Sequence, residues 1–331
     1  MINLKKEFTR IEKVFKYLNL DKIEEMGVTA FLNNDAIYAK TNDNAYLVNV
    51  VSLKEQESDY SKNKIAKIKS LEFFDKNGVH CIFPMRFNDK YFIDYRGKEY
   101  EVYKYVATEH LKKEQLSDKQ LKKLATSQAI IHNLNIKINL PCEYREIKLE
   151  FNKKTAKLEK YSKEAYKMLY EYFYQLGEAI DHNNKLLKYA SNYLILGYDN
   201  YDLNNIEWVK EYMFLIDYNN CKMINPTVSL AESAYYFSSK DGVVDYAKYE
   251  KYLSTYLKRY ENVTFDYKEA LYVSQNKRLV ELEDLVNSSI KDKEDYSDKI
   301  IPVVKEILSY NDNIERMNEA FLKIVKKQSN K

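Results

Sequence analysis

The sequence contains only three cysteines, Cys81, Cys142 and Cys221, and they lie far apart with no paired spacing. Neither a disulfide framework nor a zinc site is therefore expected, and we predict a reduced, cytoplasmic protein. No run of about 18 apolar residues occurs, and the first residues lack the apolar core of a signal peptide. We therefore expect neither a membrane span nor an interaction with a membrane.

An excess of charge of one sign is also absent. The chain has 53 basic and 50 acidic residues, spread throughout, for a net charge of +3. This balance argues against a dedicated nucleic-acid-binding protein, which would concentrate basic residues on one face. What is abundant is tyrosine, with 32 residues against 14 phenylalanines and one tryptophan. We expect most tyrosines to pack with the ring inside and the hydroxyl at the surface.

At 331 residues, of which 45% are hydrophobic, the chain is long enough for two domains or for two lobes around a cleft. Hydrophobic alternation, polar turns and the Asn77-Gly78 helix stop signal predict a small lobe over residues 1–106. It would contain an amphipathic helix at 7–18 and a charged helix at 60–76. Strands are expected at 28–32, 36–40, 45–51, 79–87, 91–94 and 99–106.

Helical periodicity dominates residues 107–331, which we predict to be a second, mostly helical lobe. Ser117 and Gln120 form a capping box that opens its first helix. Further helices are predicted at 161–180, 230–238, 246–260, 267–286 and 299–325, the last with a break near Asn311. Short strands are expected at 193–196, 206–208 and 212–216, and an exposed loop at 289–298. The fold class predicted is α+β, with a small antiparallel sheet first and helices afterwards.

The segment 198–217 carries the most informative pattern. Asn205 and Asp217 lie twelve residues apart and flank a predicted strand–turn–strand. In kinases an asparagine and an aspartate so placed hold the metal ions that bridge the nucleotide phosphates. The catalytic aspartate, which orients the acceptor hydroxyl, stands five residues before that asparagine. Here that position is Asn200, so the pattern indicates a kinase site altered at its centre.

Three flanking motifs extend this pattern: Ala129-Ile130-Ile131-His132 before it, and Leu215-Ile216-Asp217-Tyr218 and Asn225-Pro226 at its end. With them the chain resembles the aminoglycoside phosphotransferase and choline-kinase-like family, from about residue 24 to about residue 325. The resemblance implies a two-lobed protein-kinase-like fold, with ATP or GTP and Mg²⁺ as cofactors. It also implies a nucleotide or small-molecule ligand in the cleft between the lobes. Ser229 stands where some members of the family have an acidic residue.

Three positions depart from the family pattern. Asn49 stands where the third strand should carry the phosphate-binding lysine, and Lys67 stands where the following helix should carry its glutamate partner. A shifted ion pair between Lys54 and Glu72 is an alternative. The third departure is Asn200, because an amide cannot accept a proton from the substrate hydroxyl. Loss of a positioned general base costs roughly 10²–10⁴-fold in rate.

Two acidic residues near Asn200 keep an alternative open. A one-residue slip of the loop would let Asp199 or Asp202 act as the base, although both would also be explained as solvated loop residues that cap the turn. For the acceptor, Glu164, Glu171 and Glu178 recur every seven residues and would suit a cationic substrate. A solvated helix face explains these three glutamates equally well.

Two functions follow from the resemblance. One is a small-molecule phosphotransferase that acts on a hydroxyl of an aminoglycoside-, choline- or sugar-like acceptor. The other is a catalytically weak or inactive member with a binding or structural role, for which kinase-like spore-coat proteins with protein partners are a precedent. The three altered positions, Asn49, Lys67 and Asn200, favour the second function, and the intact pair Asn205 and Asp217 favours the first.

Overall fold

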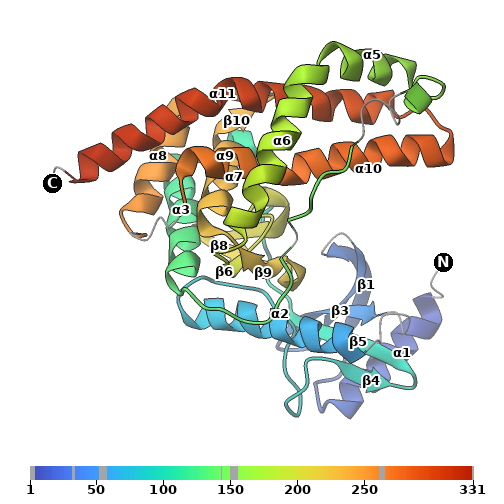
Figure 1. The fold of residues 1–331 in the computed structure, drawn as a ribbon. Coiled ribbons are helices and arrows are strands. Elements are labelled where there is room, and N and C mark those ends of the chain that lie inside the picture. Colours follow the sequence, from blue (N-terminus) through green and yellow to red (C-terminus); the bar gives the residue numbers. More distant parts are fainter. Residues whose placement is uncertain are drawn as a thin grey trace. The chain divides into compact units, whose positions relative to one another are not determined.

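The structure is a computed structural model that describes residues 4–31, 34–51, 58–142, 144–149, 156–260 and 265–329. It divides into two compact units, one made of Met1–Gln115 with Leu203–Cys221 and the other of Leu116–Asp202 with Lys222–Lys331. The α+β fold class is confirmed, with a five-stranded antiparallel sheet near the N-terminus and a mostly helical C-terminal part (Figure 1). The hairpin that carries Asn205 and Asp217 belongs to the first unit.

The sheet of the first unit has the strand order β1-β2-β3-β5-β4, and all neighbouring strands are antiparallel. Its strands are β1 (Glu25–Phe31), β2 (Asn34–Lys40), β3 (Ala45–Val51), β4 (Ile93–Tyr95) and β5 (Lys98–Lys104). Helix α1 (Leu4–Tyr17) packs Ile11, Val14 and Phe15 into one core cluster with Tyr46 and Val48 of β3. The other face carries Leu47 and Tyr103, which pack with Ile82 and Ile216.

Helix α2 (Ser58–Lys76) follows β3, and Gly78 ends it with a φ of +89°, as the stop signal predicts. The strand predicted at 79–87 is wrong. Residues 79–87 form none of the strands of the five-stranded sheet, although the amide of Met85 donates to the carbonyl of Val102 on β5 over 2.7 Å. The backbone around Cys81 pairs with Leu215. The amide of Ile82 donates to the carbonyl of Leu215 over 2.8 Å, and the amide of Leu215 donates to the carbonyl of His80 over 3.0 Å.

The hairpin of β7 (Ile206–Val209) and β8 (Tyr212–Leu215) completes the first unit, between the short turns η3 (Leu203–Asn205) and η4 (Tyr218–Asn220). Trp208 of β7, the only tryptophan of the chain, is 1% exposed. A bridge between Glu109 and Trp208 ties the hairpin to the segment that follows β5. The η2 turn (Lys113–Gln115) ends this segment.

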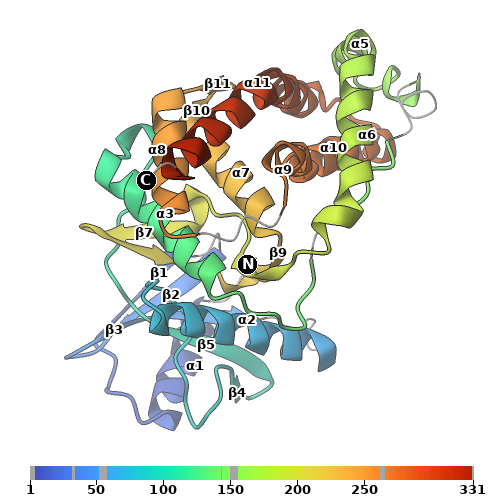
Figure 2. The same cartoon turned by 60° about the vertical axis from the view of Figure 1, so that its left-hand side comes forward.

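The second unit is mostly helical. Its helices are α3 (Asp118–Asn133), α5 (Lys163–Glu171), α6 (Phe173–Ala190), α7 (Pro226–Ser238), α8 (Tyr246–Leu257), α9 (Tyr267–Val273), α10 (Asn276–Asp292) and α11 (Ser297–Ser329). Two short strand pairs accompany them, β6 (Ile195–Tyr198) with β9 (Cys221–Ile224) and β10 (Ser239–Lys240) with β11 (Val243–Val244). Figure 2 shows α3 beside α8, with α11 running past α8 and α9. The predicted capping box of α3 is confirmed, since Ser117 and Gln120 bond each other's backbone amides.

Helix boundaries differ from the predictions where tertiary contacts decide them. The predicted helix 161–180 is divided at Tyr172, and the predicted helix 267–286 is divided after Val273. In contrast, α11 runs without the break predicted near Asn311. The polar side chains there have partners elsewhere in the second unit. Gln275, just before α10, donates to Asn311 over 2.8 Å, and Tyr246 of α8 donates to Asn313 over 2.7 Å.

The tyrosines are more deeply buried than predicted. Tyr249, Tyr252, Tyr256 and Tyr310 are each 0% exposed. Their hydroxyls lie inside and are paired there, for example Tyr252 with Gln128 over 2.9 Å and Tyr310 with Ser274 over 2.6 Å. Burial of a hydroxyl is tolerated when such a partner exists. The prediction of surface hydroxyls is therefore wrong for these residues.

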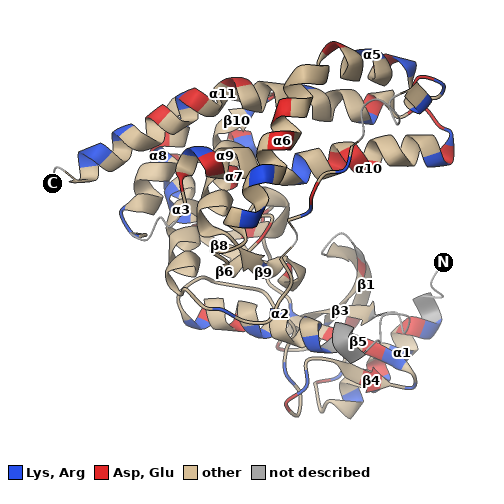
Figure 3. Cartoon of the chain, viewed as in Figure 1, with Lys and Arg blue, Asp and Glu red and all other residues tan. Residues whose placement is uncertain are grey.

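Both signs of charge are interleaved along α10 and α11, as Figure 3 shows. In the described part of the chain no helix combines the length and the apolar character that crossing a membrane requires.

Candidate functional site

A cavity of about 400 Å³ lies within the first unit. Its apolar lining comes from β1, from Leu47 of β3 and from Ile82 and Ile216, and the segment 104–106 forms another part of its border. Its polar lining includes both residues predicted to hold metal, Asn205 and Asp217. The other polar and titratable residues on it are Thr29, Lys104, Tyr105, Thr108, His110, Asn204 and Glu207.

The β7–β8 hairpin brings Asn205 and Asp217 to neighbouring positions. Ile206 and Leu215 are paired in the hairpin register, and just beyond them the amide of Ile216 donates to the carbonyl of Asn205 over 3.2 Å. The Asp217 carboxylate accepts the amide hydrogen of Asn219 over 2.9 Å and caps η4. The backbone ladder and the cap therefore fix both residues on one side of the cavity.

The donor set of this cavity fits a hard cation that carries a nucleotide. Magnesium prefers oxygen ligands and is commonly held by one or two protein groups together with phosphates and water. Asp217 and Asn205 supply a carboxylate and an amide oxygen on the cavity lining. No group of three or more His, Cys, Asp and Glu side chains that could hold a metal occurs among the described residues. A cation here would therefore depend on the phosphates for its remaining ligands.

Asn49 and Lys67, the cofactor-site candidates placed at the positions of the phosphate-binding lysine and its glutamate partner, are not among the residues that line the cavity. Asn49 lies on β3 directly opposite Glu101 of β5. Its buried side-chain oxygen has no hydrogen-bond partner in the described structure. Lys67 is a half-buried residue of α2. Burial raises the pKa of Cys221 well above its usual value, Asp217 raises it further, and Lys67 opposes both.

A buried ion pair that the sequence analysis missed lies beside Asn49. The ammonium of Lys64, on α2, is 2.7 Å from the Glu101 carboxylate, and these side chains are 7% and 4% exposed. Glu101 also accepts the hydroxyls of Tyr103 and Tyr218, each over 2.7 Å. The helix thus carries the cation and the sheet the anion, the reverse of the polarity that the resemblance implies.

A signal for this pair exists in the sequence, because Lys64 stands four and seven residues before the buried Ile68 and Leu71. A lysine on an apolar stripe requires a buried partner.

The alternative ion pair between Lys54 and Glu72 is not tested, because Lys54 lies outside the described residues. Glu72 is bonded to Lys76 over 2.7 Å and to the hydroxyl of Tyr91.

A second cavity, of about 250 Å³, lies within the second unit. Asp199 and Asn200 both line it, although Asp202 does not. Asn200 has a φ of +47°, in the left-handed region, which asparagine tolerates better than most residues. The remaining lining residues are Tyr144, Lys222, Met223, Ile224, Asn276, Lys277 and Val280.

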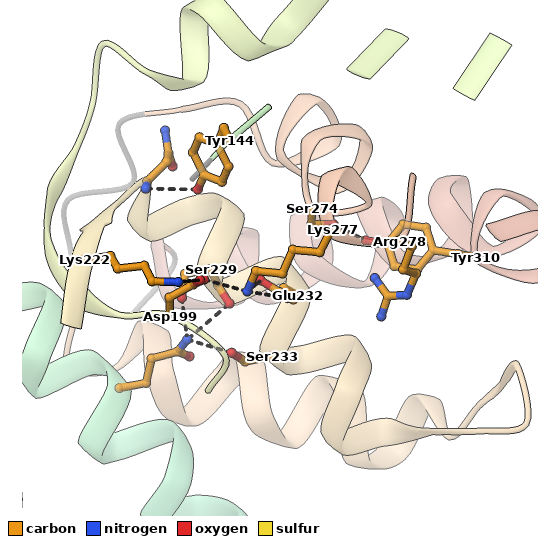
Figure 4. A network of polar contacts seen from close by, with 12 residues as sticks. Tyr144, Asp199, Lys222, Ser229, Glu232, Ser233, Ser274, Lys277, Arg278 and Tyr310 are labelled. Atoms are coloured by element: carbon orange, nitrogen blue, oxygen red, sulfur yellow. Dashed lines mark hydrogen bonds and ion pairs between the residues drawn. The ribbon is translucent and has the colours of Figure 1, made fainter. Parts of the chain in front are cut away.

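The Asp199 carboxylate is held between two lysines that approach it from opposite sides (Figure 4). Lys277 lies 2.5 Å from one carboxylate oxygen and Lys222 lies 3.2 Å from the other. Burial alone would raise the pKa of Asp199, but the two ammonium groups outweigh it and the pKa is lowered. A carboxylate stabilised in its ionised form is a weak proton acceptor. Asp199 is therefore poorly suited to replace a catalytic base.

Two neighbouring features of the second unit are structural. His132, on α3, is 1% exposed and its Nδ1 lies 2.6 Å from the Tyr256 hydroxyl. Burial lowers the pKa of His132 to about 3, so it is neutral near pH 7. Asn225 caps α7 through the amides of Thr227 and Val228, over 3.0 and 3.2 Å. The three glutamates considered for a cationic acceptor, Glu164, Glu171 and Glu178, are all exposed to solvent, as expected for a solvated helix face.

Neither a protein-family model nor a curated protein matches the chain. Solved structures do match it. A spectinomycin phosphotransferase, solved with ADP and spectinomycin, aligns over 94% of this chain and 98% of its own, with a TM-score of 0.64 and 13% identity. An amicoumacin kinase, solved with AMP-PNP and Ca²⁺, aligns over 93% and 96% with a TM-score of 0.59 and 13% identity.

A choline kinase from Streptococcus pneumoniae aligns over 96% of this chain and 99% of its own, with a TM-score of 0.54 and 14% identity. At such low identity these matches establish the fold. The chain has a kinase-like fold. More particularly, its fold is that of the antibiotic phosphotransferases and choline kinases, in the divergent form that the sequence motifs predicted.

Proposed function

We propose that the protein is a divergent kinase of the aminoglycoside phosphotransferase and choline-kinase-like type that binds ATP or GTP with Mg²⁺ and transfers phosphate weakly or not at all. Nucleotide would occupy the cavity of the first unit, with Asp217 and Asn205 as metal ligands. Magnesium would neutralise phosphate charge there. The matched kinases with bound nucleotides support this use of the fold.

One observation carries the proposal of weak catalysis: Asp199, the carboxylate next to Asn200, is ion-paired to both Lys222 and Lys277. Asn200 itself cannot accept a proton. A phosphoryl acceptor would therefore lack an effective base, which costs roughly 10²–10⁴-fold in rate. Asn49 adds a second defect, because an amide supplies no charge to a phosphate.

An active phosphotransferase is the second candidate, and one observation favours it. Lys64 and Glu101 keep a buried ion pair between α2 and the sheet, and Glu101 also holds Tyr218, the residue after Asp217. This arrangement would fix the metal-binding carboxylate even though the lysine is on the helix. In that case transfer to a hydroxyl of a small molecule would proceed at an ordinary rate.

A thermal-shift titration with ATP and GTP, each with and without Mg²⁺, tests nucleotide binding. We expect stabilisation that requires Mg²⁺ and is lost in Asp217→Ala. Asp94→Ala, which removes an exposed carboxylate of β4 in the same unit, is the matched control and should behave as the wild type. Stabilisation that is independent of both Mg²⁺ and Asp217 would contradict the metal assignment.

Turnover is tested separately, by release of ADP from ATP with hydroxylated small molecules as acceptors. We expect rates far below those of an ordinary kinase, whose turnover is typically 1–100 per second. A rate within that range for any acceptor would reject weak catalysis and establish the second candidate.

A further inference from the structure

The cavity of the second unit, which Asn200 lines, has more positive than negative side chains on its lining. Its charged lining residues are two lysines, Lys222 and Lys277, and one carboxylate, Asp199. The lining therefore carries one net positive charge. Glu232, which is 3.0 Å from Lys277, is not among the lining residues. An incoming ligand would meet more positive than negative charge.

The two lysines come from elements that hold them in place. Lys222 belongs to β9 and its side chain is 8% exposed, whereas Lys277 belongs to the first turn of α10 and its side chain is 33% exposed. Burial alone would lower the pKa of Lys277, but the carboxylates of Glu232 and Asp199 outweigh it, and the pKa is raised. The N-terminal turn of a helix also carries partial positive charge. The helix backbone and the two lysine side chains thus both contribute positive charge to the cavity.

Two further polar side chains on the lining are held in place by hydrogen bonds within the protein. Tyr144 is fixed, since its hydroxyl accepts the backbone amide of Asn225 over 3.1 Å. Asn276 is fixed as well, because its amide group donates to Asn183 over 2.9 Å and to the carbonyl of Arg145 over 2.8 Å. A volume of about 250 Å³ lies below the usual range of drug-sized ligand sites, roughly 300–1,000 Å³. The cavity therefore fits a ligand of only a few carbon atoms better than an aminoglycoside.

We propose that this cavity binds a small hydroxylated anion, a molecule with a carboxylate or phosphate group that Lys222 and Lys277 recognise. Its identification as the acceptor of phosphoryl transfer rests on the proposed function, whereas the binding itself does not. The anionic group would share the two ammonium groups with Asp199, and a hydroxyl of the same molecule would lie beside Asn200. A quaternary or primary ammonium ligand would instead be repelled by the net charge of the lining.

Isothermal titration calorimetry without nucleotide or Mg²⁺ tests this inference. The probes are glycerate and glycerol 3-phosphate as anions, glycerol as the neutral analogue and choline as the cation. We expect measurable binding of at least one anion and none of glycerol or choline. Comparing glycerate with glycerol 3-phosphate separates carboxylate from phosphate recognition. Binding of choline in preference to both anions would overturn the proposal.

Charge variants test the inference in two directions, because one should raise the affinity for the anion and the other should abolish it. Asp199→Asn removes the carboxylate that competes with the anion, so affinity for the bound anion should rise at least about fivefold. Lys222→Met should abolish the binding, and Lys188→Met, an exposed lysine of α6, should leave it unchanged. Should Lys222→Met fail to fold by circular dichroism, Lys277→Gln replaces it. Weaker anion binding in Asp199→Asn would contradict the inference.

The nucleotide titration of the first unit keeps the two proposals apart. If Lys222→Met loses the anion but retains the Mg²⁺-dependent shift with ATP, both proposals stand. If the wild type binds the anion but no nucleotide, the proposed function fails and the anion site remains. If nucleotide binds but neither anion does, the anion site is rejected and the proposed function remains.

Discussion

Glu101 in the first unit and Asp199 in the second are both buried carboxylates bound by lysine, but their surroundings differ. Glu101 has Lys64 and two tyrosine hydroxyls as partners and is absent from the lining of its unit's cavity. Asp199 has two lysines as partners and lines a cavity. The ion pair of Glu101 therefore joins secondary-structure elements, whereas that of Asp199 can also meet a ligand.

This difference indicates how a kinase-like fold can stay stable when residues of its predicted site are replaced. A buried charge needs a partner wherever it stands, and the first unit contains the buried pair Lys64–Glu101. Asn49 and Lys67 stand where the resemblance predicted the phosphate-binding lysine and its glutamate partner. At Asp199 the two ion pairs lower the pKa of the carboxylate, which under the proposed function would weaken it as a proton acceptor.

The largest effect is expected from Glu101→Gln. Among the described residues, Glu99 at 3.8 Å is then the carboxylate left beside the buried ammonium of Lys64. Breaking a buried pair by removing one partner costs about 3 kcal/mol. Urea unfolding followed by the fluorescence of Trp208, the one tryptophan and a residue of the first unit, measures it.

Lys76→Met is the control for Glu101→Gln. It removes one of the two partners of Glu72, the other being the hydroxyl of Tyr91, and the Lys76 side chain is 68% exposed. Exposed pairs of this kind contribute little, so the loss should stay below about 1 kcal/mol. Equal losses in the two variants would show that the Glu101 pair does not stabilise the first unit.

Acid should weaken the second unit through His132. Its pKa is about 3 in the folded protein and about 6.5 in the unfolded chain, so the unfolded state binds more protons between these values. Stability is therefore lost as the pH falls below 6.5, by about 2 kcal/mol at pH 5. Far-UV circular dichroism during urea unfolding at pH 7.5 and pH 5 measures it. The loss should disappear in His132→Gln and persist in His182→Gln, which changes an exposed histidine of α6.

Particular residues show how far the sequence alone could lead. The strand β3 was predicted with its observed bounds, and the capping box of Ser117 was found, because both depend on local patterns. The continuous α11 could not be predicted, since Gln275 and Tyr246, distant in sequence, bind its polar residues. The metal candidates Asn205 and Asp217 follow from spacing, but the partners of Asp199 do not. Lys222 and Lys277 meet it only in the folded chain.

A smaller effect is expected from Asp199→Asn. Lys277 keeps Glu232 as a partner and is one-third exposed, whereas Lys222 loses its ion pair with the Asp199 carboxylate. The burial cost of the carboxylate itself also disappears, and the net loss should be about 1 kcal/mol. Urea unfolding followed by circular dichroism measures it. A loss as large as that of Glu101→Gln would remove the distinction between a pair that joins elements and a pair on a cavity.

The smallest effect is expected when the lysine is moved from the helix to the sheet. Lys64→Met alone leaves Glu101 buried without its ammonium and should cost about 3 kcal/mol. Because Asn49 lies directly opposite Glu101, adding Asn49→Lys supplies a new ammonium and removes an unpaired amide oxygen. The double variant should therefore lie within about 1 kcal/mol of the wild type by Trp208 fluorescence. Asn49→Met with Lys64→Met controls for side-chain volume and should show no recovery. If the double variant is no more stable than Lys64→Met, the Glu101 carboxylate can pair only with a cation on α2. The packing of the helix, and not the sheet, would then decide which element carries the lysine.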